Sequence, residues 1–97
     1  MKLLNRDQVK ALVIESLKQV AGVPADVEDA TFDQMVEFQR KVFIEALKKH
    51  INEEPVIDGD GNAFYDIDLN LNSFDNWATV GDCIDSITEN LRITFRN

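Results

Sequence analysis

Four oxygen-bearing side chains in one short stretch have the spacing to hold a hard cation. Asp58, Asp60, Asn62 and Asp66 stand at positions 1, 3, 5 and 9 of a loop of the calcium-binding type. Position 6 is Ala63, where such a loop needs glycine for its sharp turn, and position 12 is Leu69 instead of a bidentate glutamate. The pattern therefore favours an ordinary hairpin turn without metal, and calcium binding through residues 58–66 is the alternative.

The chain offers little material for nucleophilic chemistry. Cys83 is the single cysteine and His50 the single histidine. Cys83 lies on the apolar side of a predicted helix, where a thiol usually acts as a small core residue. One histidine cannot build an ordinary zinc site alone, and no serine or cysteine lies near His50 in the sequence. We therefore expect no catalytic residue, no metal and no enzymatic activity. A lone cysteine also suits a reducing compartment, which favours a cytoplasmic location.

Acidic side chains are concentrated in the second half of the chain. The net charge is −8, and no lysine or arginine lies between Lys49 and Arg92. Such a surface repels nucleic acid and anionic lipid and attracts basic partners, although the charge can also serve solubility alone. No apolar run approaches the ~20 residues of a membrane span. We therefore predict a basic protein surface as the partner. The residues expected to contact it are Glu53, Glu54, Asp66, Asp68 and Asp75.

These side chains must be positioned by helices and strands that the sequence pattern also predicts. Asn5 and Gln8 have the spacing of a capping box, which marks the start of a helix. Apolar residues then repeat at helical spacing as far as residue 21, and Gly22 and Pro24 prevent continuation. The first helix is therefore predicted over residues 6–21.

A second, central helix is predicted over residues 31–51, with Thr31 or Asp33 as its cap. Its apolar face is unusually wide and includes Val36, Phe38 and Phe43, so it must be covered from more than one side. Gln39 falls among these apolar positions. Either a partner satisfies its amide group, or the side chain lines a groove.

From residue 63 the period of the pattern changes from helix to strand. Apolar residues alternate with mainly acidic and amide side chains over residues 63–71. Turn-forming residues 58–62 precede this stretch, and a short strand at 55–57 would complete a hairpin. Residues 91–96 also alternate, so the tail is a candidate third strand that would place its arginines beside the acidic strand face.

The last predicted helix begins at a second capping box, formed by Thr79 and Asp82. A narrow apolar stripe follows it and predicts a helix over residues 80–90. The whole chain, residues 1–97, is therefore predicted to be one domain of the α+β class. It would contain three main helices, with a small antiparallel hairpin or sheet inserted at about residues 55–71.

This last helix is similar in sequence to the last helix of acyl carrier proteins. The resemblance is carried by Thr79-Val80-Gly81-Asp82 and by the pattern of two apolar residues, aspartate, any residue and isoleucine that ends at Ile87. The first helix, the Val23-Pro24 loop and Ala30-Thr31-Phe32 are also similar. The resemblance covers roughly half of the chain. It implies a carrier-like helical bundle in which residues 53–72 are an insertion.

The resemblance also indicates where a phosphopantetheine arm would be attached. In the family the arm is carried by the serine of an Asp-Ser-Leu triplet at the start of the second helix, and the matching residues here are Asp33, Gln34 and Met35. Gln34 has no hydroxyl group, so we expect no arm and no cofactor. Ser86, in Asp-Ser-Ile within the last helix, and Ser73 are remote candidates for attachment.

One function is preferred and two alternatives remain. We predict a non-enzymatic, acidic protein-interaction module on an acyl-carrier-like scaffold that lacks the attachment serine. The first alternative is a genuine, divergent carrier of acyl or aminoacyl groups with a phosphopantetheine arm. The second is a calcium-binding module that uses the loop at residues 58–66.

Overall fold

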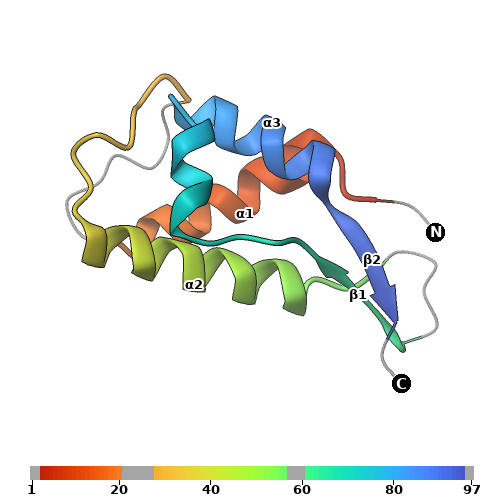
Figure 1. Cartoon of the computed structure of the whole chain (residues 1–97). Coiled ribbons are helices and arrows are strands. Elements are labelled where there is room, and N and C mark those ends of the chain that lie inside the picture. The colour runs from red at the N-terminus through yellow and green to blue at the C-terminus, as the bar shows by residue number, and fades with distance from the viewer. Residues whose placement is uncertain (1–2, 21–27, 57–60, 96–97) are drawn as a thin grey trace.

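The described part of the chain contains three α-helices, one 3-10 helix and two short strands (Figure 1). The computed structural model describes residues 3–20, 28–56 and 61–95. The elements in chain order are α1 (Arg6–Lys18), α2 (Glu37–Glu53), β1 (Ala63–Asp66), the 3-10 helix η1 (Leu71–Asn76), α3 (Val80–Asn90) and β2 (Arg92–Phe95). This mixture of helices and a small antiparallel sheet confirms the predicted α+β class.

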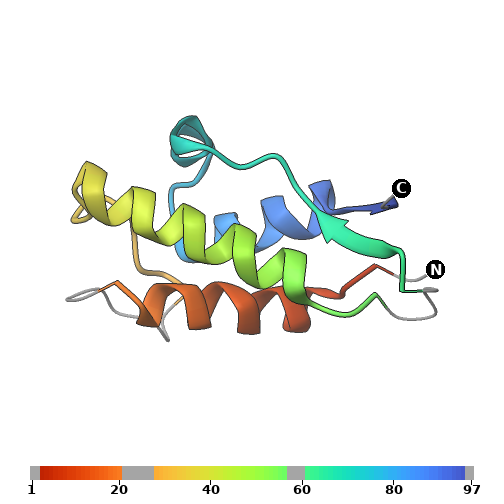
Figure 2. The same ribbon diagram turned by 90° about the horizontal axis from the view of Figure 1, so that it is seen from below.

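The helices form the body of the molecule, and the sheet lies at one end of them (Figure 1). α1 contacts both α2 and α3, and β1 packs against α2. Residues 28–36 lie at the end opposite the sheet (Figure 1). Figure 2 shows η1 on the side of α2 and α3 that faces away from α1. The chain between β1 and α3 therefore passes over the helical body, and α3 then leads back to the sheet at β2.

The core joins aliphatic residues of the three helices to a cluster of aromatic rings. The ring centroid of Phe32 lies 5.8 Å from that of Phe43, 5.2 Å from that of Phe74 and 5.9 Å from that of Trp77. Aromatic pairs at such distances add stabilisation beyond the area that they bury. The largest fully buried side chains elsewhere are Leu17, Leu47, Ile51, Tyr65, Ile84 and Ile87.

Both predicted capping boxes are confirmed. The Gln8 N–H donates to Asn5 Oδ1 and the Asn5 N–H to Gln8 Oε1, each at 2.9 Å. Thr79 and Asp82 make the same reciprocal pair at 3.2 Å, and α3 has the predicted bounds.

α1, in contrast, ends three residues before its predicted end. The Val20 N–H donates to the Leu17 carbonyl oxygen at 2.9 Å, a short-range bond that tightens and closes the last turn. The predicted stop residues Gly22 and Pro24 lie outside the described residues.

The predicted start of α2 is wrong by six residues. The segment before it is not helical, because Thr31 forms an isolated β-bridge with Thr79 and residues 33–34 lie in a turn. The Val80 N–H donates to the Ala30 carbonyl oxygen at 2.8 Å, and the Gly81 N–H donates to that of Glu28 at 2.9 Å. These bonds hold the segment along the start of α3, so it cannot be helical.

Gln39 marks the true start of α2. Its Oε1 accepts from the Val36 N–H at 2.9 Å, so the amide group that interrupts the apolar pattern satisfies a backbone donor at the helix end. Phe43 is fully buried as predicted. Val36 and Phe38, however, are 62% and 74% exposed. The first turn of α2 extends past the core, and the buried residues of this helix begin at Phe43. The predicted place of Val36 and Phe38 on the buried face is therefore wrong.

The predicted hairpin is also wrong, because β1 pairs with the tail strand. β1 and β2 are antiparallel, with Tyr65 opposite Ile93 and Asp66 opposite Arg92. Pro55 and Val56 are in no strand, and residues 57–60 lie outside the described residues. Ile67 and Leu69 are buried as their alternation predicts, although β1 ends at Asp66. Alternation indicates which side chains face the core, but it does not specify which strand lies alongside.

The cross-strand ion pair between Asp66 and Arg92 tests this pairing. Arg92 Nη2 lies 3.0 Å from Asp66 Oδ2, with the side chains 33% (Asp66) and 55% (Arg92) exposed. We expect a double-mutant cycle of Asp66→Asn and Arg92→Gln to give a coupling of about 0.2–1 kcal/mol, smaller at high salt. Urea unfolding of the four proteins measures it. Strictly additive changes in the free energy of unfolding would contradict the pairing.

Candidate functional site

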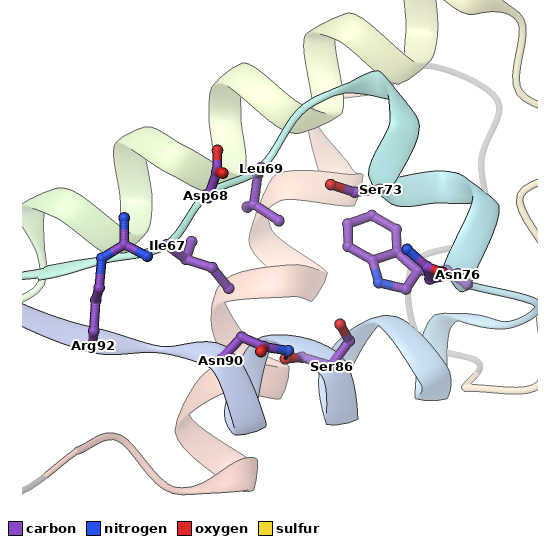
Figure 3. A pocket seen from close by; sticks show the side chains of 9 residues that line it. Ile67, Asp68, Leu69, Ser73, Asn76, Ser86, Asn90 and Arg92 are labelled. Carbon is purple, nitrogen blue, oxygen red and sulfur yellow. Dashed lines mark hydrogen bonds between the residues drawn. The ribbon is translucent and has the colours of Figure 1, made fainter.

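A cavity of about 260 Å³ lies between residues 67–77 and α3 (Figure 3). Ile67 and Leu69 give it an apolar wall, and both are nearly buried. Figure 3 shows the polar ends of Ser73, on one side, and of Ser86 and Asn90, on the other, turned toward the space between them. Asn76, Trp77, Asp68 and Arg92 complete the lining.

The chain before η1 sets the direction of these side chains. In the extended segment after β1, Asp68 points away from the side on which Ile67 and Leu69 enter the cavity (Figure 3). Asn70 then caps η1: its Oδ1 accepts from the Asn72 N–H at 2.8 Å, and its own N–H donates to Ser73 Oγ at 3.1 Å. The cap fixes the start of η1 and thereby the cavity residues that it carries.

Several polar groups of the cavity have no partner within the described chain. Trp77 is only 5% exposed, and its indole N–H donates to no acceptor among the described residues. No described side-chain nitrogen or oxygen is both sealed from solvent and unpaired, so this N–H is accessible where Trp77 lines the cavity. The side chains of Asn76 and Ser86 are likewise unpaired within the described ranges. Trp77 is the buried one of the three residues, whereas Asn76 is exposed and Ser86 half-buried, so water or a ligand can reach these polar groups.

The acidic residues predicted to contact a partner fall into two groups. Glu53 and Glu54 lie near Ala63 and Phe64 of β1. Asp68 lies on the cavity segment, and Asp75 precedes the cavity residue Asn76 on η1. Those four carboxylates have no ion-pair partner among the described residues, whereas Asp66 is paired with Arg92.

Arg6 joins three elements through an ion-pair network that no local sequence pattern indicated. Its Nη2 lies 2.6 Å from Glu28 Oε1, and its Nε lies 2.6 Å from Asp85 Oδ1. Lys10 Nζ adds a contact of 2.8 Å to Glu28. The hydrogen bond from Arg6, followed by that from Lys10, lowers the pKa of Glu28 to about 2. Arg6 thereby balances the charge of Asp85, and its two ion pairs connect the segment before α2 to α1 and α3.

The lowered pKa of Glu28 predicts a loss of stability in acid. A carboxylate with a lower pKa in the folded state stabilises the fold above its unfolded pKa of about 4.5, and that contribution disappears as the pH falls toward 2. We expect Arg6→Gln to lower stability at neutral pH and to flatten its decline between pH 4.5 and 2. Urea unfolding across this range measures both. Parallel acid profiles for the two proteins would show that Arg6 does not set this pKa.

None of the residues considered for phosphopantetheine attachment lies at the start of α2. Gln34 is exposed in a turn before α2 and is not at the start of that helix, because α2 begins at Glu37. Ser73 and Ser86 are both half-buried walls of the one cavity. Cys83 is fully buried, which raises the pKa of its thiol and makes it a core residue, as predicted.

The calcium hypothesis rests mainly on residues whose placement is not described. Asp58 and Asp60 lie outside the described residues, Asn62 is exposed, and the Asp66 carboxylate is bound by Arg92. Within the described ranges, no group of three or more histidine, cysteine, aspartate or glutamate side chains could hold a metal ion. The single histidine, His50, has its ring Nε2 2.8 Å from Gln19 Nε2.

No family model matches this chain, and neither a curated protein nor a solved structure is significantly similar to it. Among the described helices, none combines the length and the apolar character needed to cross a bilayer. We therefore infer a function from the unpaired acidic side chains and from the cavity.

Proposed function

We propose that this protein is a non-enzymatic, acidic interaction module that binds a basic protein surface. The proposal is carried by the uncompensated carboxylates of the second half of the chain. Asp68 and Asp75 are exposed and have no ion-pair partner in the described structure, and Glu53 and Glu54 are also unpaired there. Unpaired carboxylates create a negative potential that steers basic partners and accelerates their association.

The scaffold that we propose is acyl-carrier-like. Its support is the sequence similarity of α1 and α3 to that family, together with the order of the three α-helices. The β1 segment then stands where the resemblance requires an insertion, between α2 and α3. Gln34 matches the family's attachment serine in sequence and has no hydroxyl group, which supports a protein that keeps the scaffold without the arm. The acidic surface on the inserted segment would then be the part of the molecule that binds the partner.

Reversing the charge of Asp68 and Asp75 tests this function. We expect Asp68→Lys/Asp75→Lys to weaken binding of a fluorescent, blocked lysine-rich peptide at least about fivefold at low salt, because each exposed pair contributes a few tenths of a kcal/mol and reversal adds repulsion. Fluorescence anisotropy at low and high salt measures the affinity and its salt dependence.

A matched control separates a local surface from net charge. Glu15→Lys/Asp33→Lys changes the net charge equally, uses exposed residues and lies outside the acidic half. It should change the affinity much less. Equal losses for the two double variants would mean that the peptide responds only to total charge, which would contradict a dedicated surface.

A further inference from the structure

We propose that the cavity between residues 67–77 and α3 binds the backbone of an extended segment of the basic partner. Its uncharged groups would pair with a peptide group, while the acidic residues outside it would bind neighbouring lysine or arginine side chains. This inference rests on the proposed function, because it assigns the basic partner a place on the surface. The carboxylate of Asp68 points out of the cavity, where it would bind a basic side chain, whereas Ile67 and Leu69 point into the cavity (Figure 3).

The indole of Trp77 is the most informative group in the cavity. It is 95% buried, since only 5% of the residue is exposed, and its N–H has no acceptor in the described chain. An indole N–H is a donor only, so its partner must be an acceptor. Rings of the core hold it in place: Trp77 lies 5.1 Å from Phe74 and 5.9 Å from Phe32, centroid to centroid. A backbone carbonyl oxygen suits this fixed donor.

The other uncharged groups present both donors and acceptors. The amide group of Asn76 does both, and so does the hydroxyl of Ser86; neither is paired within the described ranges. Ser73 Oγ accepts from the Asn70 N–H, which leaves its own proton to donate. A peptide group likewise has one donor and one acceptor and carries no charge. The set therefore fits a neutral amide better than it fits an anion or a cation.

Size and apolar contacts agree with a short stretch of chain. At about 260 Å³, the cavity lies just below the ~300–1,000 Å³ typical of sites for drug-sized ligands, so it does not enclose a large cofactor. Ile67 and Leu69 line it and offer contact to an aliphatic stem.

Charge around the cavity would set the direction of the segment. The guanidinium group of Arg92 lines the cavity while paired with Asp66, so that end of the cavity offers no free carboxylate to a basic side chain. Asp68 and Asp75 are exposed acids on the segment and helix that form the facing wall. Basic side chains of the partner would therefore point toward these two carboxylates.

Trp77 is the only tryptophan of the chain, so its indole N–H resonance reports on the cavity without ambiguity. The probe is the blocked tripeptide acetyl-Lys-Gly-Lys-amide, titrated while this resonance is followed by NMR. We expect a saturable downfield shift. The analogue with sarcosine in place of glycine keeps the charge but loses one amide N–H, and it should bind about two- to tenfold more weakly. Cadaverine has the same charge and no peptide group, and it should leave the indole resonance unmoved.

Variants of the cavity give an independent readout. Asn76→Ala and Ser86→Ala should each weaken binding of the tripeptide about two- to tenfold. Asn72→Ala is the matched control, because Asn72 is an exposed residue of the same 3-10 helix and does not line the cavity. It should leave the affinity unchanged.

The outcomes separate this inference from the proposed function. If the longer lysine-rich peptide binds through Asp68 and Asp75 while the indole resonance and the two cavity variants show no effect, the cavity assignment is overturned and the acidic docking function stands. An indole shift of equal size with cadaverine would overturn the peptide assignment as well. If neither lysine peptide binds, both proposals fail.

Discussion

Phe32→Ala should lower the free energy of unfolding by about 3–5 kcal/mol, because it removes a buried aromatic ring and leaves a cavity. Phe32 is 3% exposed and contacts the rings of Phe43, Phe74 and Trp77. A domain of this size is typically stable by only about 5–15 kcal/mol, so the loss is a large share of the total. Urea unfolding followed by circular dichroism measures it.

Phe38→Ala is the matched control for that experiment. Phe38 is the same residue type and is 74% exposed at the first turn of α2. Its removal should change stability by less than about 0.5 kcal/mol. A large loss at Phe38, or a small one at Phe32, would support the continuous helix from residue 31 that the periodicity predicts and would contradict the non-helical segment before α2.

Tyr65→Ala should be the next most damaging single change, again with a loss of about 3–5 kcal/mol. Tyr65 has no exposed surface, stands opposite Ile93 in the sheet, and belongs to the strand that packs against α2. Through this anchor β1 fixes the start of the segment that carries Asp68 and the cavity wall. The same unfolding measurement applies.

Tyr65→Phe separates the ring from the hydroxyl group. It keeps the aromatic volume and should lose no more than about 0.5–1.5 kcal/mol, the net value of a typical hydrogen bond. If Tyr65→Ala were tolerated as well as Tyr65→Phe, the strand would not be anchored in the core, and the described position of the cavity would be wrong.

Local signals allowed much of the helical structure to be predicted. The two capping boxes depend on residues three positions apart, and both were confirmed with the expected reciprocal bonds. The stripe of α3 was confirmed because Cys83, Ile84 and Ile87 all face the core with no exposed surface. Caps and periodicity act within one or two turns, so they are readable without the rest of the fold.

Long-range contacts explain the errors. The start of α2 is decided by hydrogen bonds between residues 28–30 and the first turn of α3, about fifty positions away in the chain. Arg40 also holds that segment, since its guanidinium donates to the Phe32 and Met35 carbonyl oxygens at 3.0 and 3.1 Å. The partner of β1 is similarly set by tertiary structure. Neither fact has a signature in the spacing of nearby residues.

The sequence allowed the negative charge of the candidate site to be predicted, but not its cavity. The absence of lysine and arginine between residues 49 and 92 is visible in the sequence, which led us to predict Asp68 and Asp75 as binding residues, and both are exposed in the structure. Trp77 is nearly buried, with only 5% of the residue exposed. That its unpaired N–H shares a cavity with Asn76 and Ser86 depends on how residues 67–77 lie relative to α3, which no sequence pattern specified.

We propose that a basic partner binds at the acidic second half of the chain. The most direct test of this proposal is a map of amide chemical-shift changes when the blocked lysine-rich peptide is added at low and high salt. We predict changes concentrated at residues 53–54 and 66–77 that vanish at high salt. Changes spread evenly over the acidic residues, with Asp7, Glu15 and Asp33 affected as strongly as Asp68 and Asp75, would contradict a dedicated binding surface.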